Sequence, residues 1–241
     1  MKKIKTHTIL ISDIHLGSKM SQSNDLLLFL DNIEVENLVL NGDVFDDLRF
    51  NRLKHMDWEV FSQFRKMSDK CNILWVRGNH DFIHEKFMSC LLGVNVVKNF
   101  YWHIGKKRVL ATHGDIWDIF IYKYKLISDV LTWIYNKFQE KNSELMRGFN
   151  KLLKEKSKMM IKNTEAVRNG AIKLAKENAI NIVICGHTHI AELVEKDSII
   201  YGNCGTWESA IPTYITIDEN IIKLFQFENG KSILLKGILL K

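Results

Sequence analysis

The chain has 241 residues, of which 46% are hydrophobic and 26% charged, a balance typical of a globular protein with a sizeable core. Its single proline and 13 glycines exclude a Pro/Gly-rich linker between domains, and no apolar run is long enough to span a bilayer. The formal net charge of +6 favours anionic partners such as phosphorylated small molecules, anionic lipid or nucleic acid.

The cysteines and the N-terminal residues indicate a cytoplasmic protein. The four cysteines lack Cys-x-x-Cys spacing, so we expect buried, reduced thiols rather than a disulfide framework. Three lysines near the N-terminus precede an apolar run that is too short for the central segment of a signal peptide.

Short apolar, β-branched runs recur along the chain and predict buried strands. They cover residues 8–11, 38–40, 73–76, 108–112 and 182–185, and further short strands are predicted at 199–201, 213–217, 221–227 and 232–235. Residues 25–29 are predicted to form the beginning of a first amphipathic helix. In a second helix, Trp58, Phe61, Phe64 and Met67 recur at helical spacing, which predicts that they pack in the core. Strands that alternate with helices and then follow one another predict an α/β sandwich of mixed sheets.

Residues that bind metals or transfer protons follow five of these strands. Since ligands of open α/β sheets gather at the carboxyl ends of the strands, we expect the five stretches to meet at one site. The stretches are Asp13-Ile14-His15, Gly42-Asp43, Gly78-Asn79-His80-Asp81, Thr112-His113-Gly114-Asp115 and Gly186-His187-Thr188-His189.

This mixture of residue types suits the hydrolysis of a phosphoester by two metal ions. Two ions that share one carboxylate lower the pKa of a bridging water, which becomes the nucleophile, and they neutralise the phosphate oxygens. Asp, His and Asn side chains together suit Mn²⁺, Fe²⁺ or Zn²⁺ better than Ca²⁺. We therefore expect two divalent ions of this kind.

The five stretches resemble those of the calcineurin-like metallophosphoesterases. The resemblance implies a four-layer α-β-β-α sandwich of two mixed sheets and a dinuclear centre. It assigns the first metal to Asp13, His15 and His189, the second metal to Asn79, His113 and His187, and the bridge to Asp43. It also implies that His80 acts as the acid or electrophile beside the leaving group and that Asp46 orients it. This pairing is physically reasonable, because a carboxylate hydrogen-bonded to an imidazole fixes the tautomer of the ring and raises its pKa.

Within this superfamily, the chain is most similar to the UDP-2,3-diacylglucosamine pyrophosphatase-like branch. The similarity rests on the segment 113–118, on a basic helical insertion before Gly186, and on the loop 203–209. It implies a lipid-linked nucleotide substrate, Mn²⁺ as the first choice of ion, a role in lipid A synthesis and contact with the cytoplasmic face of the inner membrane. The best-known members of the branch have Arg where this chain has His80.

The chain is expected to form one domain over residues 1–241, with a helical cap insertion at about 116–178. Between residues 122 and 162 the insertion holds ten Lys or Arg and four Asp or Glu residues. Its formal net charge of +6 equals that of the whole chain. An apolar stripe runs through it at helical spacing. Such a segment packs on the core, holds an acyl chain or contacts a membrane surface. The candidate substrate-binding residues are Asn203, Trp207, Trp117 and Tyr122.

Two other functions compete with the lipid-linked substrate. A phosphodiesterase or nuclease could use the basic insertion to bind a nucleic-acid backbone, although no basic and aromatic groove is evident. A scaffold with this fold but without metals is a third interpretation. The presence of all seven ligands and of His80 argues against a scaffold.

Overall fold

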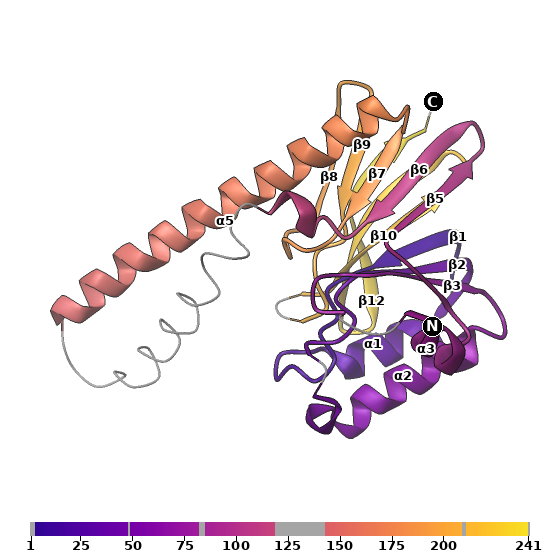
Figure 1. Cartoon of the computed structure of the whole chain (residues 1–241), viewed down its shortest axis with the longest axis horizontal. Coiled ribbons are helices and arrows are strands. Elements are labelled where there is room, and N and C mark those ends of the chain that lie inside the picture. The colour runs from indigo at the N-terminus through magenta and orange to yellow at the C-terminus, as the bar shows by residue number, and fades with distance from the viewer. Residues whose placement is uncertain (1–2, 48, 82–84, 119–142, 209–210, 241) are drawn as a thin grey trace.

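Two mixed β-sheets form the centre of the computed structural model, which describes residues 3–47, 49–81, 85–118, 143–208 and 211–240 (Figure 1). The seven-stranded sheet has the order β12-β11-β10-β1-β2-β3-β4, and the five-stranded sheet has the order β5-β6-β7-β9-β8. In the first sheet β1 to β4 are parallel, while β10 pairs with β1 in the antiparallel sense. In the second sheet β6, β7 and β9 are parallel, and both edge strands are antiparallel.

The elements alternate along the first two thirds of the chain, as the sequence predicts. The larger sheet comprises β1 (Ile4–Ile11), β2 (Ile33–Asn41), β3 (Asn72–Val76), β4 (Asn95–Val97), β10 (Thr213–Asp218), β11 (Ile221–Glu228) and β12 (Lys231–Leu239). The smaller sheet comprises β5 (Asn99–Ile104), β6 (Lys107–Thr112), β7 (Ile182–Cys185), β8 (Glu192–Lys196) and β9 (Ile199–Asn203). The helices are α1 (Ser23–Asp31), α2 (His55–Met67), α3 (Glu85–Leu92) and α5 (Ser143–Glu177), with the 3-10 turns η1 (Phe50–Arg52) and η2 (Asp115–Trp117).

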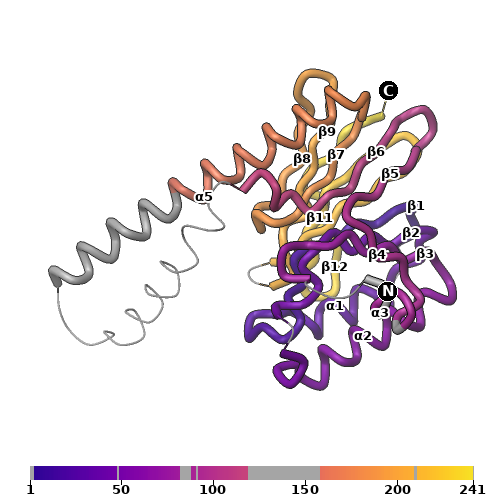
Figure 2. Tube along the Cα trace, in the orientation of Figure 1, coloured from indigo at the N-terminus to yellow at the C-terminus, as the bar shows by residue number. Residues whose placement is uncertain are grey.

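Alternation of side chains along the strands produces the four layers. On β1, Ile9 and Ile11 pack toward α1 and α2, whereas Leu10 points into the space between the sheets. On β7, Ile184 packs between the sheets and Val183 packs against α5. Since neighbouring residues of a strand point to opposite faces, each buried strand needs a cover on both sides. The predicted α-β-β-α sandwich is therefore confirmed (Figure 2).

Three strands were not predicted from the sequence, and all three lie at sheet edges. They are β4, β5 and β8. An edge strand is less buried, so it needs no continuous apolar run, and β8 reads Glu-Leu-Val-Glu-Lys. The prediction that Trp58 packs in the core was also wrong. Phe64 on the same helix is fully buried, but Trp58 is 46% exposed.

The helix α5 packs only part of its length on the smaller sheet. Val167, Ala171 and Ala175 lie against Leu110 and other residues of that sheet's outer face, whereas the N-terminal part of α5 extends away from the body (Figure 1). The expected insertion thus contains this helix. The apolar stripe of the insertion was predicted over residues 116–138; Ile116 is 58% exposed, and the rest of the stripe lies outside the described residues. Among the described helices, none is both long enough and apolar enough to cross a membrane.

Candidate metal centre

Five predicted ligands adopt left-handed backbone conformations at the ends of their strands. The φ angles are 52° at Asp13, 49° at His15, 53° at Asp43, 68° at His187 and 58° at His189. Few residues other than glycine adopt positive φ, and such strain gathers at functional sites. The loops thus turn sharply after β1, β2 and β7, which directs these side chains toward one another.

The first predicted ligand set comes together as expected. The Nε2 atom of His189 lies 3.2 Å from Oδ1 of Asp13 and 3.3 Å from Nε2 of His15. Asp13 is fully buried and His15 nearly so. Their ligand atoms lie within 4.8 Å of one another, a spacing that a single ion can span. Asp13, His15 and His189 therefore fit the first ion.

The second set meets the first at Asp43. The Nε2 atom of His113 lies 3.2 Å from Oδ2 of Asp43 and 3.2 Å from Oδ1 of Asn79. His187 completes the group with Asp43 and His113. The same Asp43 oxygen lies 3.8 Å from Nε2 of His15, which belongs to the first set. One carboxylate thus serves both sets, and the mixture of O and N donors suits two divalent transition-metal ions.

Charges inside the site shift the pKa values of its ligands in the metal-free chain. Burial alone would lower the pKa of His113, but the adjacent Asp43 carboxylate raises it to about 10. Burial alone would raise the pKa of the Asp43 carboxyl, but the adjacent His113 holds that pKa well below its ordinary value. A metal ion binds the neutral imidazole, so metal binding must displace a proton from His113.

Two glycines allow the loops to approach these ligands closely. A Cβ atom on Gly42, where φ is 92°, would lie 2.1 Å from Nδ1 of His113. A Cβ atom on Gly78 would lie 2.2 Å from Oδ1 of Asp43. Both distances are far shorter than a van der Waals contact, so any side chain at either position would displace a ligand.

His80 lies beside the bridging carboxylate, but a different group from the one expected orients it. Its backbone N–H donates to Oδ1 of Asp43 at 2.8 Å, and its Nδ1 lies 2.6 Å from the main-chain oxygen of Asp46. The Asp46 carboxylate instead pairs with Nη1 of Arg52 at 2.6 Å. The prediction that this carboxylate orients His80 was therefore wrong: the main chain of Asp46 holds the ring.

Asp81 joins two of the ligand loops, although no role was predicted for it. Its buried carboxylate accepts hydrogen bonds from the backbone N–H groups of Asp43, Val44 and Gly78 at 2.8 to 3.0 Å, and from Nε1 of Trp75 at 3.0 Å. Burial and the nearby Asp43 raise the pKa of Asp81 to about 6. Asp81 thus fixes the loop that presents Asp43. Its position directly after His80, within a predicted ligand stretch, was the sequence feature that could have predicted a role in the site.

Glu208 is a second acidic group that was missed. One of its carboxylate oxygens lies 3.9 Å from Nε2 of His15 and 3.9 Å from Nδ1 of His189, while the other accepts from Oγ of Ser18 at 2.7 Å. Glu208 follows Trp207 in the loop 203–209, one of the segments on which the resemblance to the branch rests. Its direction toward the first ligand set depends on the tertiary structure.

The candidate substrate-binding residues have structural roles where they are described. Trp207 is fully buried against Phe29, and its Nε1 donates to the oxygen of Thr213. The buried Asn203 donates to the main-chain oxygen of Gly186, so it supports the loop that carries His187. Both side chains are fully buried and hydrogen-bonded within the protein, so neither is accessible to a substrate in this structure. Trp117 packs against α5, and Tyr122 lies outside the described residues.

Comparisons with known proteins agree with this geometry. The family model for calcineurin-like phosphoesterases matches residues 6–191. A single mutant of Vps29 from Entamoeba histolytica is a similar structure, with a TM-score of 0.54 at 14% identity over 97% of this chain and 99% of that one. The Escherichia coli phosphoesterase YfcE has a TM-score of 0.54 at 16% identity with the same coverage.

At these identities the structures support the fold alone, and they do not support the finer resemblance to the UDP-2,3-diacylglucosamine pyrophosphatase-like branch. No curated protein sequence matches the chain significantly. The family match covers every predicted metal ligand and His80. This chain therefore belongs to the calcineurin-like phosphoesterase family and is a metal-dependent phosphoesterase.

Proposed function

We propose that the chain hydrolyses a phosphoester or pyrophosphate bond in a nucleotide-linked lipid, such as UDP-2,3-diacylglucosamine. The observation that carries this proposal is the apolar surface on the loops around the metal centre. Met20, Phe50 and Ile116 are 55%, 40% and 58% exposed, and each lies in a loop or turn that follows a ligand-bearing strand. Exposed apolar side chains at these positions would suit the acyl chain of a lipid substrate.

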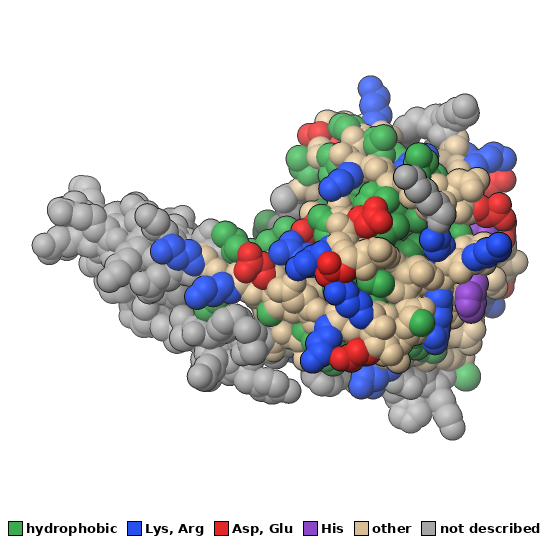
Figure 3. Space-filling model, turned by 90° about the horizontal axis from the view of Figure 1, so that it is seen from above, with side chains coloured by type: hydrophobic (Ala, Val, Ile, Leu, Met, Phe, Trp, Pro, Cys, Tyr) green, Lys and Arg blue, Asp and Glu red, His purple; other side chains and the backbone are tan. Residues whose placement is uncertain are grey.

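The helix α5 carries further exposed apolar side chains. Met160 and Ile161 are 45% and 54% exposed near the point where the helix leaves the body, and the exposed Lys158 and Lys162 lie beside them. Figure 3 shows apolar side chains there with Lys and Arg side chains close by. Apolar groups flanked by cations suit an acyl chain attached to an anionic head group. On this proposal the protein works at the cytoplasmic face of the inner membrane as a peripheral protein.

The site divides the chemistry among its residues. Asp13, His15, Asp43, Asn79, His113, His187 and His189 would hold the two ions. Bound there, divalent ions activate water and neutralise phosphate oxygens, and Mn²⁺ is our proposed choice. The carbonyl oxygen of Asp46 can only accept, so Nδ1 of His80 carries a proton. Nε2 is then left to deliver a proton to the leaving oxygen when the ring is doubly protonated.

The test is Mn²⁺-dependent hydrolysis of UDP-2,3-diacylglucosamine, measured beside bis(p-nitrophenyl) phosphate and single-stranded DNA. We expect fast release of UMP and slow cleavage of the other two substrates. A variant that carries Met20→Ser and Ile116→Ser should reduce the ratio of lipid to generic diester turnover. Comparable turnover of all three substrates would contradict the lipid proposal and leave the metal chemistry intact.

A nuclease or phosphodiesterase is the second candidate. It is favoured by the ten Lys and Arg residues between residues 122 and 162, which would attract a phosphate backbone. Cleavage of single-stranded DNA that is faster than UMP release, and that falls steeply with added salt, would support this function instead.

A further inference from the structure

Asp118 contacts a metal ligand from the start of the insertion. It follows the 3-10 turn η2, and its Oδ2 atom lies 2.6 Å from Nε2 of His187. Both side chains are only 9% exposed. A short hydrogen bond in a nearly water-free position holds the imidazole ring firmly, because few solvent molecules compete for it.

This contact determines which nitrogen of His187 is free for a metal ion. A carboxylate accepts hydrogen bonds, so Nε2 carries the hydrogen and the lone pair remains on Nδ1. Metal-binding histidines generally donate their other ring N–H to a carboxylate or carbonyl, which fixes the tautomer and strengthens the ligand. His113 follows the same rule, with its Nδ1 3.0 Å from the main-chain oxygen of Asn41.

We propose that Asp118 is a positioning residue for the second metal ion, acting through His187. Asp118 orients the ring, sets its tautomer and thereby raises the affinity of the second ligand set. This inference rests on the two-metal chemistry of the proposed function and is independent of the lipid substrate.

The helix α5 holds Asp118 in turn. The side-chain amide of Asn163 donates to the same Oδ2 atom of Asp118 at 2.8 Å. Two contacts anchor α5 just C-terminal to Asn163: Arg168 pairs with Glu192 of β8 at 2.5 Å, and Trp117 packs where a side chain on Gly170 would lie. The helix that extends from the body is therefore connected to the second ligand set through Asn163, Asp118 and His187.

Metal binding to the full chain tests this proposal without any substrate. Isothermal titration with Mn²⁺ should resolve two ions in the wild type, and His187→Ala should identify the step that depends on the second ligand set. In Asp118→Ala we expect that step to weaken by about 10- to 100-fold, as for other residues that orient metal ligands, while the other step changes less than about twofold. Asp118→Asn keeps an acceptor oxygen and should restore part of the affinity.

Matched variants separate positioning from general damage. Asp115→Asn alters a carboxylate three residues away on the same turn and should leave both binding steps unchanged. Asn163→Ala should weaken the same step as Asp118→Ala but less strongly, and the double variant should be no worse than Asp118→Ala, since Asn163 acts through Asp118. Thermal unfolding of each metal-free variant monitors the fold.

Three results would overturn the proposal. The first is a pair of unchanged binding steps in both Asp118 variants. The second is an equal weakening of both steps in the two Asp118 variants. The third is a loss in Asp115→Asn as large as the loss in Asp118→Ala.

Discussion

The two sheets contribute different chemistry to the site. Loops of the seven-stranded sheet bring the carboxylates Asp13 and Asp43 together with Asn79 and His80, whereas the five-stranded sheet contributes only imidazoles, from His113, His187 and His189. His15 is the imidazole that the seven-stranded sheet adds to the first ligand set. Each of the two predicted ligand sets therefore draws on both sheets, and both sets are complete where the sheets meet.

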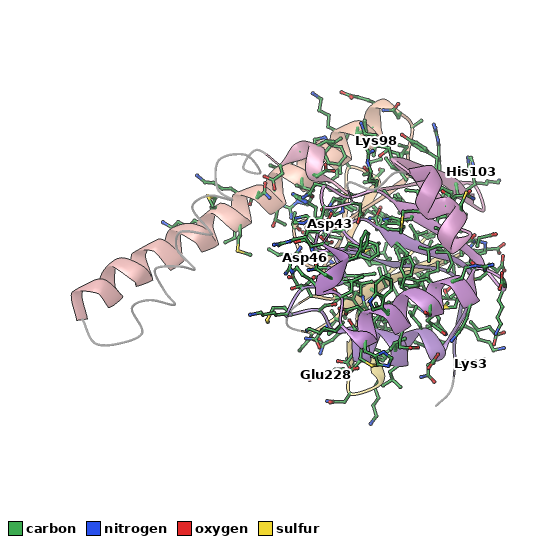
Figure 4. The ribbon with its side chains drawn as sticks, turned by 60° about the horizontal axis from the view of Figure 1, so that its bottom comes forward. Lys3, Asp43, Asp46, Lys98, His103 and Glu228 are labelled. Atoms are coloured by element: carbon green, nitrogen blue, oxygen red, sulfur yellow. The ribbon has the colours of Figure 1, made fainter. Side chains whose placement is uncertain are left out.

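The junction of the sheets has its own structural residue. Asn41, at the end of β2, is fully buried, and its side-chain amide donates to the main-chain oxygens of Thr112 and Ile184 on β6 and β7. Its own main-chain oxygen faces Nδ1 of His113 at 3.0 Å. Figure 4 shows Asp43 and Asp46 on the side of the body from which α5 extends, and His103 on the opposite side.

The largest effect is expected at the residue that both ligand sets share. Asp43→Ala removes the common carboxylate, so metal-dependent turnover of bis(p-nitrophenyl) phosphate should fall below detection. Asp47→Ala, which changes a partly exposed carboxylate paired with Arg49 and Arg52, is the matched control and should stay active. Full turnover in Asp43→Ala with two ions bound would disprove the shared-ligand arrangement.

His80 tests the division between metal binding and proton transfer. His80→Ala should reduce turnover by about 10²- to 10⁴-fold, the usual range for a general acid, while both Mn²⁺ ions remain bound. The exposed His103, on the other side of the molecule, supplies the control variant His103→Ala. Metal content measured on the purified variants decides the matter, since loss of an ion from His80→Ala would make His80 a ligand.

Asn41→Ala tests the junction between the sheets. The variant leaves two buried carbonyl oxygens without this donor, so the free energy of unfolding should fall by about 1–3 kcal/mol. Urea unfolding measures the change. Asn37→Ala alters an exposed amide on the same strand and should cost much less. Equal losses in the two variants would mean that Asn41 does not join the sheets.

The last prediction is a pH dependence of the stability of the metal-free chain. The folded-state pKa of His113 is about 10, above its ordinary value of 6.5. The proton bound to His113 therefore makes its full contribution to the free energy of unfolding below pH 6.5. That stability is lost as the pH rises through 10, by at most about 1.4 kcal/mol per pH unit for one proton. Urea unfolding with EDTA at about pH 7 and about pH 9.5 should show a steeper decline in the wild type than in His113→Gln. Parallel declines would contradict the predicted proton on His113.

The sequence determined the strands that are buried on both faces and the ligands that follow them. A strand covered on both sides needs a continuous apolar run, and parallel strands bring the residues after them to one edge. Residues 8–11, 38–40 and 182–185 were recognisable for that reason, and so was the meeting of Asp13, Asp43 and His187. The edge strands β4, β5 and β8 lacked the signal because they are less covered.

Only the tertiary structure decided which atoms of each loop make contact. The direction of a side chain after a sharp turn depends on backbone angles and on partners far along the chain, which no local pattern encodes. The orientation of His80 by the main chain of Asp46, the burial of Trp207 and the contact between Asp118 and His187 all follow from that dependence. Residue types and strand ends thus predicted where the metal centre lies, while the packing of the two sheets and α5 decided how its ligands are held.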